Sequence, residues 1–215
     1  MKERPILFSG PMVRALLAGT KTQTRRIVKP QPDSRPGMEC TRVLFKNRKG
    51  DVVLDEAAEA KEPRLCAILC PYGQPGDRLW VRETHNTHGG LATYRADGDW
   101  IADYHREEPQ QPRLRWVPAI HMPRTASRIL LEITSVRVER LQDISEADAY
   151  AEGIEQTDFI EDAEHQEPAT GAPPGRYAYR ALWEDINGPD SWAQNPWVWV
   201  VEFERAKATE KGKKQ

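Results

Sequence analysis

Hydroxyl and cationic side chains gather in one short stretch near the N-terminus, where residues 19–26 read Gly-Thr-Lys-Thr-Gln-Thr-Arg-Arg. Thr24 offers a potential nucleophile, and Lys21 offers a potential base if burial or neighbouring cations keep its amine partly neutral. Arg25 and Arg26 offer contacts for an anion. The stretch therefore combines the groups that acyl transfer needs, although a basic surface loop has the same composition.

The preceding residues predict how this stretch is presented. A strand is expected at residues 6–8 and a helix at residues 11–17, because Pro11 suits a first helical turn and the residues after it are mostly helix formers. Gly19 can take the left-handed conformation that ends a helix. The chain is therefore expected to leave the helix just before Lys21.

Three stretches of the sequence resemble, in the same order, the ASCH domain, a family named for homology to an activating signal cointegrator. The first covers residues 6–30, the second reads Pro-Gly-Asp-Arg-Leu-Trp-Val-Arg-Glu at residues 75–83, and the third covers residues 141–154. With the closing residues 195–203, they account for most of the chain outside its insertions. The chain most resembles the longer, phage-associated branch of this family.

The resemblance implies an activity. ASCH proteins with an assigned activity are amidohydrolases of N4-acetylcytidine that use a lysine, a threonine and a glutamate, which fall here on Lys21, Thr24 and Glu152. Hydrolysis of an N-acyl bond needs a nucleophile, a base for its proton and an acid for the departing nitrogen. Thr24 would attack, neutral Lys21 would accept its proton, and Glu152 would protonate or orient the cytosine amine. This chemistry requires the pKa of Lys21 to lie well below about 10.4.

The same motifs supply candidate substrate contacts. The first motif contributes two arginines, and the second contributes a tryptophan, an arginine and a glutamate. His121 lies in a segment similar to one of the longer branch, where it would either contact a ligand or cap a strand. The full set of candidate contacts is Arg25, Arg26, Trp80, Arg82, Glu83 and His121.

Two other functions use the same residues. A non-catalytic RNA-binding module would hold phosphates with the cations of the first motif and stack bases on Trp80, Tyr94 or Trp116. A ribonuclease would use the same basic cleft on a phosphodiester. The hydrolase needs the hydroxyl of Thr24, whereas a binding module tolerates alanine there. In each case the expected partner is a nucleoside or RNA.

Strand-like and helix-like segments together predict an α+β protein rich in antiparallel strands. Composition does not separate a barrel from a sandwich, but the ASCH resemblance implies a PUA-like small β-barrel with peripheral short helices and long loop insertions. We expect a single domain over residues 1–205, with insertions near residues 31–72, 84–127 and 155–175. Residues 206–215 are polar and are expected to form a disordered tail.

The longest strand is expected at residues 128–140. Its second half alternates, which places Ile133 and Ser135 on one face and Thr134 and Val136 on the other.

Turn and cap signals place the other elements. The Asp-Gly pair at residues 97–98 predicts a hairpin between residues 92–96 and 100–104. Ser145 and Gly153 predict the start and the end of a helix. Further strands are expected at residues 42–45, 79–83 and 197–203, and a further helix at residues 177–186.

Composition and charge narrow the class of protein. The 215 residues have a mean hydropathy of −0.72 and 30% charged side chains, with no apolar run long enough to span a bilayer and no visible signal peptide. Residues 1–50 carry 12 basic and three acidic side chains, so their net charge is +9 against −11 for the rest. This asymmetry favours an anionic ligand, with nucleic acid or a nucleotide as the leading candidate.

Cysteine usage suggests a compartment. Three cysteines, an odd number, argue against a secreted disulfide framework and favour a reducing cytoplasm. Cys40, Cys66 and Cys70 could supply zinc ligands, but their spacing is unusual and no fourth ligand is apparent nearby. We therefore expect no metal and no cofactor, and the sequence does not indicate an oligomeric state.

Overall fold

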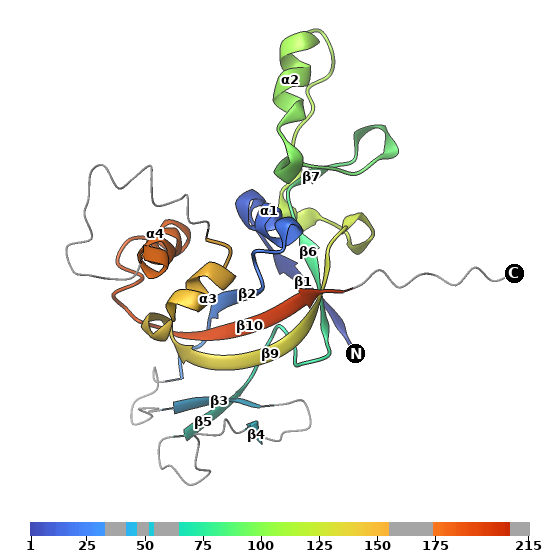
Figure 1. Cartoon of the computed structure of the whole chain (residues 1–215). Coiled ribbons are helices and arrows are strands. Elements are labelled where there is room, and N and C mark those ends of the chain that lie inside the picture. Colours follow the sequence, from blue (N-terminus) through green and yellow to red (C-terminus); the bar gives the residue numbers. More distant parts are fainter. Residues whose placement is uncertain (33–41, 47–51, 54–64, 155–173, 207–215) are drawn as a thin grey trace, which may run out of the picture.

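The computed structural model describes residues 1–32, 42–46, 52–53, 65–154 and 174–206, and it has an α+β architecture (Figure 1). The α+β prediction is therefore confirmed. The α-helices of this described part are α1 (Gly10–Ala18), α2 (Trp100–Glu107), α3 (Glu146–Ala151) and α4 (Pro174–Asn187).

The centre of the fold is an open, mixed sheet of five strands. Its order is β1 (Glu3–Leu7), β6 (Arg78–Arg82), β9 (Leu130–Arg140), β10 (Trp197–Arg205) and β2 (Gln23–Ile27). Strands β1 and β6 are parallel, and the other neighbours are antiparallel. The edge strands β1 and β2 do not pair with each other, so the five strands do not close into the small barrel that the resemblance implies.

Strand β10 is apolar on both faces because the sheet is covered on both sides. Trp199 and Val201 belong to a core cluster that also contains Leu16 of α1. Val198 and Val200 belong to a second cluster, which contains residues of α3 and α4. A nearly continuous apolar run is typical of a strand that is buried on both faces.

The turn after α1 takes the course that the sequence predicts. Gly19 ends the helix with a φ of 81°, and its N–H donates to the carbonyl of Leu16 at 3.3 Å. Thr22 then donates its N–H to the carbonyl of Ala151, at the end of α3, at 2.9 Å. Lys21 is therefore held between the C-terminal ends of α1 and α3.

Helices α3 and α4 lie where the sequence predicts them. Ser145 caps α3, because its Oγ accepts the N–H of Asp148 at 3.1 Å while the carboxylate of Asp148 binds Ser145 in return. Gly153 follows the helix with a φ of 88°. No helix in the described ranges is long and apolar enough to cross a membrane.

The prediction of a hairpin around residues 97–98 is wrong. Residues 100–107 form α2 instead, and the carboxylate of Asp99 caps this helix by accepting the N–H of Ala102 at 3.4 Å. The same carboxylate accepts the indole N–H of Trp116 at 2.7 Å. Helix capping and this more distant contact outweigh the local turn signal of Asp-Gly.

Strand β9 runs where predicted, but a bulge changes its faces. The pairing with β10 shifts register between Glu202 and Phe203. Ser135 and Ile133 pair with these two neighbouring residues of β10, so Thr134 between them has no partner on that strand. One extra residue shifts the alternation by one position. Ile133 and Val136, which we expected on opposite faces, are consequently buried in the same core cluster.

Two of the predicted insertions contain elements of their own. The insertion near residues 31–72 carries a small three-stranded sheet, which confirms the strand expected at residues 42–45. The insertion near residues 84–127 carries α2 and a two-stranded sheet. The predicted loop at 155–175 and tail at 206–215 lie almost wholly outside the described residues.

The small sheets and 3-10 turns complete the described elements (Figure 1). The strands are β3 (Arg42–Lys46), β4 (Val52–Val53), β5 (Leu65–Leu69), β7 (His85–Asn86) and β8 (Thr93–Tyr94). The 3-10 turns are His88–Gly90, Arg95–Asp97, Ala119–His121, Arg124–Ala126 and Leu141–Asp143.

Candidate functional site

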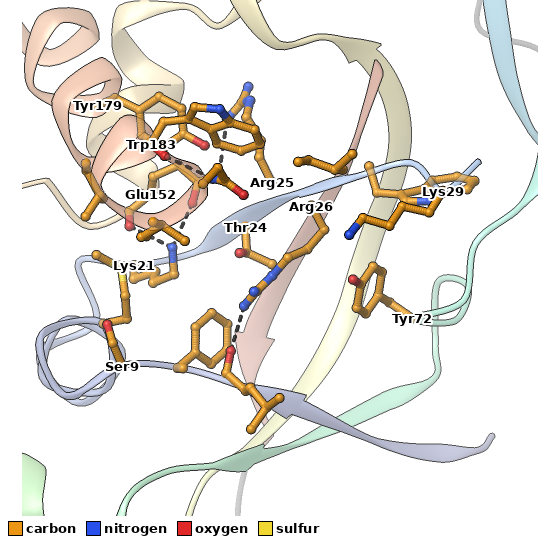
Figure 2. A pocket seen from close by; sticks show the side chains of 18 of the residues that line it. Ser9, Lys21, Thr24, Arg25, Arg26, Lys29, Tyr72, Glu152, Tyr179 and Trp183 are labelled. Atoms are coloured by element: carbon orange, nitrogen blue, oxygen red, sulfur yellow. Dashed lines mark hydrogen bonds and ion pairs between the residues drawn. The ribbon is translucent and has the colours of Figure 1, made fainter. Parts of the chain in front are cut away.

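One pocket brings together the three residues expected to be catalytic (Figure 2). Lys21, Thr24 and Glu152 all line it, although Lys21 and Glu152 are 131 residues apart in the sequence. Its volume of about 460 Å³ falls within the roughly 300–1,000 Å³ typical of small-molecule sites. Much of its apolar wall comes from Phe8, Met12, Leu182, Trp183 and Ile186.

Lys21 and Glu152 form a buried ion pair in this pocket. The ammonium Nζ donates to the carboxylate Oε2 at 2.8 Å and to the backbone carbonyl of the same glutamate at 2.7 Å. Each residue is only 4% exposed. Gly153 makes room for the pair, because a Cβ at this position would lie 3.0 Å from the Cβ of Lys21. The end of α3 and the turn after α1 are thus packed tightly around the two charges.

Burial lowers the pKa of Lys21 below its ordinary value. The attraction and hydrogen bond of Glu152 oppose this shift, and repulsion from Arg26 and Arg25 adds to it. A lysine with a lowered pKa is more readily deprotonated near neutral pH, which is what a general base requires.

Thr24 presents a hydroxyl to the same pocket. It lies on edge strand β2, opposite Val201 of β10, and is 4% exposed. Figure 2 shows its side chain facing the hollow that Lys21 also faces. Among the described residues, no hydrogen bond engages this hydroxyl. The hydroxyl is therefore not committed to a structural contact.

Arg25, expected from the sequence to contact the substrate, lines the pocket, but its guanidinium is enclosed by carboxylates of the protein. Its guanidinium contacts three carboxylates, those of Glu139 (2.5 Å), Asp148 (3.3 Å) and Glu152 (3.3 Å), and its side chain is 0% exposed. Burial works against its charge, but Glu139 and Glu152 outweigh burial and raise the pKa of Arg25. Arg25 binds Oε1 of Glu152 while Lys21 binds Oε2, so both carboxylate oxygens are held.

Sequence reasoning missed the residues that support Arg25. Arg137 binds both Glu139 and Asp148, each at 3.1 Å. Gln23 donates to the carboxylate of Asp148 at 3.0 Å and to its carbonyl at 2.7 Å. The alternation of charged residues in the second half of β9 was the available signal, since it places Arg137 and Glu139 on one face.

Arg26, unlike Arg25, keeps part of its guanidinium free of carboxylates. Its Nη2 donates to the carbonyl of Leu7 at 2.6 Å, and the guanidinium lies 5.3 Å from the ring centre of Phe8. Its Nε is buried without a hydrogen-bond partner in the described part of the chain. Because Arg26 lines the pocket and no carboxylate of the described residues pairs with it, its charge remains available there.

The other predicted contacts lie outside this pocket. Arg82 donates to the carbonyl of Met122 at 3.1 Å and lies 5.3 Å from the ring of Trp80. Glu83 is buried and binds Arg128 at 2.9 Å. These contacts attach β6 to the segment that follows α2.

His121 and the other two aromatic residues proposed for stacking, Tyr94 and Trp116, are also absent from the pocket lining. His121 is exposed in a 3-10 turn. The hydroxyl of Tyr94 donates to the carbonyl of Ala126 at 2.9 Å, and Trp116 binds Asp99 as described above. The predicted contacts thus divide into those at the pocket and those in the neighbouring insertion.

The described residues contain no group of three or more histidine, cysteine or acidic side chains that could hold a metal ion. Cys70 is buried, and burial raises the pKa of its thiol to about 11. Cys40 and the side chain of Cys66 lie outside what the structure describes.

No family model, no curated protein and no solved structure matches this chain. The similarity to ASCH domains therefore rests on the sequence motifs alone.

Proposed function

We propose that this protein hydrolyses an N-acyl group on a cytidine-like base, as an N4-acetylcytidine amidohydrolase does. The observation that carries the proposal is the buried Lys21–Glu152 pair beside the uncommitted hydroxyl of Thr24, in a pocket of small-molecule size. The three residue types are those that the ASCH resemblance implies for this activity. The geometry adds support because it brings them together from two distant segments.

The ion pair suits this chemistry because either Nζ of Lys21 or Oε2 of Glu152 can hold the proton that lies between them. Transfer of one proton from Nζ of Lys21 to Oε2 of Glu152, across 2.8 Å, would turn the pair into a neutral amine and a neutral acid. Burial lowers the pKa of Lys21 and so favours its neutral amine. The neutral pair contains both the base and the acid that amide cleavage needs.

The reaction then follows in two halves. Oγ1 of Thr24 attacks the acyl carbon while Lys21 accepts the hydroxyl proton, and Glu152 donates its proton to N4 as the C–N bond breaks. This leaves an acyl ester on Thr24 and restores the ion pair. One proton then returns from Lys21 to Glu152, so that Lys21 is again a neutral amine. Lys21 accepts a proton from water as this water attacks the ester, and it gives that proton to the threonine oxygen as the carboxylic acid leaves. The acid loses its own proton to solvent.

The test is chromatographic turnover of N4-acetylcytidine by the wild type and by Thr24→Ala. We expect the wild type to release cytidine and acetate, and Thr24→Ala to lose at least about a thousandfold in kcat/KM, as removal of a nucleophile does. Thr22→Ala is the matched control, since Thr22 is an exposed threonine two positions earlier. Thr24→Ser should keep measurable activity because it retains a hydroxyl.

Unchanged turnover in Thr24→Ala would refute the nucleophile. Absence of turnover by well-folded wild type would refute the hydrolase and favour the second candidate, an RNA-binding module. That candidate is supported by Arg26 and Lys29, two pocket cations that contact no carboxylate within the described residues. RNA cleavage by the same preparation would favour the third, a ribonuclease.

A further inference from the structure

The charges that line the pocket are unbalanced. Among the described residues, four cations line it, namely Lys21, Arg25, Arg26 and Lys29, against one carboxylate, Glu152. Lys21 and Arg25 are both ion-paired with Glu152, and Arg25 also contacts two acidic residues behind the pocket wall. The two cations on this side of the pocket, Lys21 and Arg25, are therefore already paired with carboxylates of the protein.

The other side of the pocket retains two cations. Lys29 is exposed, and neither it nor Arg26 contacts a carboxylate in the part of the chain that the structure describes. Arg26 is held in place by the carbonyl of Leu7 and by the ring of Phe8, so its guanidinium is oriented before any ligand arrives. Tyr72 lines the same side, and Figure 2 shows its hydroxyl toward Lys29. Within the described residues, the two cations of this group therefore face no carboxylate.

A neutral nucleoside would leave this side of the pocket unsatisfied. The buried Nε of Arg26 already lacks a hydrogen-bond partner among the described residues, and covering the pocket with a ligand would remove water from the guanidinium as well. Unpaired buried charges are costly, whereas a phosphoryl group matches an arginine and a lysine in both charge and geometry.

We propose that the substrate carries a phosphoryl group on its sugar and that Arg26 and Lys29 bind it, with Tyr72 donating a further hydrogen bond. The proposal rests on the proposed function, which places the acylated base at Lys21, Thr24 and Glu152. Arg26 lies two residues after Thr24 on β2. Lys29 and Tyr72 lie on the side of the pocket away from Lys21 and Glu152 (Figure 2). One ligand can therefore place its base at Thr24 and its phosphoryl group at Arg26 and Lys29. Lys29 is thereby a specificity residue for a nucleotide.

Product binding tests this inference without depending on catalysis. Titration of the wild type with cytidine, cytidine 5′-monophosphate and cytidine 3′-monophosphate is followed by tryptophan fluorescence, because Trp183 and Trp199 line the pocket. We expect one of the monophosphates to bind at least about tenfold more tightly than cytidine, and added salt to reduce that difference.

Lys29→Met supplies the decisive comparison, since Lys29 is exposed and its loss should not affect folding. We expect it to weaken monophosphate binding about tenfold and to leave cytidine binding unchanged. Lys2→Met is the matched control, because Lys2 is also exposed and does not line the pocket. Equal affinities of wild type for cytidine and both monophosphates, or equal weakening of all three by Lys29→Met, would overturn the inference.

The outcomes also separate this inference from the proposed function. Phosphate-dependent binding without hydrolysis of N4-acetylcytidine or its monophosphates would refute the hydrolase and keep the phosphoryl site. Equal hydrolysis of nucleoside and nucleotide, with no effect of Lys29→Met, would keep the hydrolase and refute the phosphoryl site. A short cytidine-containing RNA in the same titration identifies the source, since tighter binding than the monophosphates would assign the phosphoryl group to a polymer.

Discussion

The side chains of Arg25 and Arg26 leave β2 toward opposite faces of the sheet, as successive residues of a strand do. Arg25 enters the α3 and α4 side and meets three carboxylates. Arg26 turns toward β1, where it meets a backbone carbonyl and the ring of Phe8. Two adjacent residues of the same type therefore have different roles: Arg25 positions Glu152, and Arg26 faces the ligand.

The lowered pKa of Lys21 predicts how stability depends on pH. Because the folded-state pKa lies below the ordinary 10.5, the unfolded chain binds more protons at this group between the two values. The contribution of Lys21 to the free energy of unfolding therefore rises with pH through this window. Lys21→Met removes that rise, which denaturant titrations of both proteins at a series of pH values from neutrality up to about 10.4, the ordinary pKa of lysine, would measure.

Lys2→Met is the control for this experiment, because Lys2 is exposed and does not line the pocket. It should retain the wild-type pH dependence. Identical slopes for the wild type and Lys21→Met would contradict the burial effect on Lys21.

At the scale of elements, two glycines that end helices differ in what surrounds them. Gly19 and Gly153 both have positive φ, 81° and 88°. A Cβ on Gly19 would meet nothing within 4 Å, whereas a Cβ on Gly153 would lie 2.9 Å from the Cβ of Ala15 and 3.0 Å from that of Lys21. The second glycine therefore serves the packing of α1 against α3 as well as the turn.

Gly153→Ala is predicted to be clearly more destabilising than Gly19→Ala. Both substitutions carry the left-handed strain of about 1–2 kcal/mol, and only Gly153→Ala adds overpacking of about 1–3 kcal/mol. It should also lower turnover, since it displaces Lys21 from Glu152. Thermal and denaturant unfolding of the two variants would measure the difference. Equal decreases in the free energy of unfolding would mean that α1 moves to make room for the extra methyl group, and would contradict the prediction.

Helices and strands could be predicted where the residues that determine them are close together in the sequence. The helix end at Gly19, the cap at Ser145 and the strands β6 and β10 all follow from residues within a few positions of each other. The predicted hairpin failed because Asp99 caps a helix and binds Trp116, which lies 17 residues away. The bulge at Thr134 depends on pairing with another strand and has no signal within β9 itself.

At the scale of the whole molecule, β10 joins the two core clusters. Val200 and Val201 are adjacent and fully buried, but they belong to different clusters on opposite faces of the sheet. Each cluster therefore depends on the same strand. This arrangement favours cooperative unfolding of the described body as one unit.

Val200→Ala and Val201→Ala are predicted to destabilise the protein similarly, each by about 2 kcal/mol for the lost methyl groups and the resulting cavity. Far-ultraviolet circular dichroism and tryptophan fluorescence should give coincident denaturation curves in both variants. A variant that shifted only one of the two signals would indicate that the two faces unfold separately and would contradict a single domain.

The sequence by itself determined the local features of this protein: the helix ends, most strands, the apolar β10, and the motif positions of Lys21, Thr24 and Glu152. Each depends on residue type, on short-range spacing or on a linear pattern. Only the tertiary structure decided that Arg25 is enclosed by carboxylates, that Trp80 and Glu83 lie outside the pocket, and that Lys29 lines it. Burial, desolvation and ion pairing depend on residues that are distant in the sequence, so no local pattern records them.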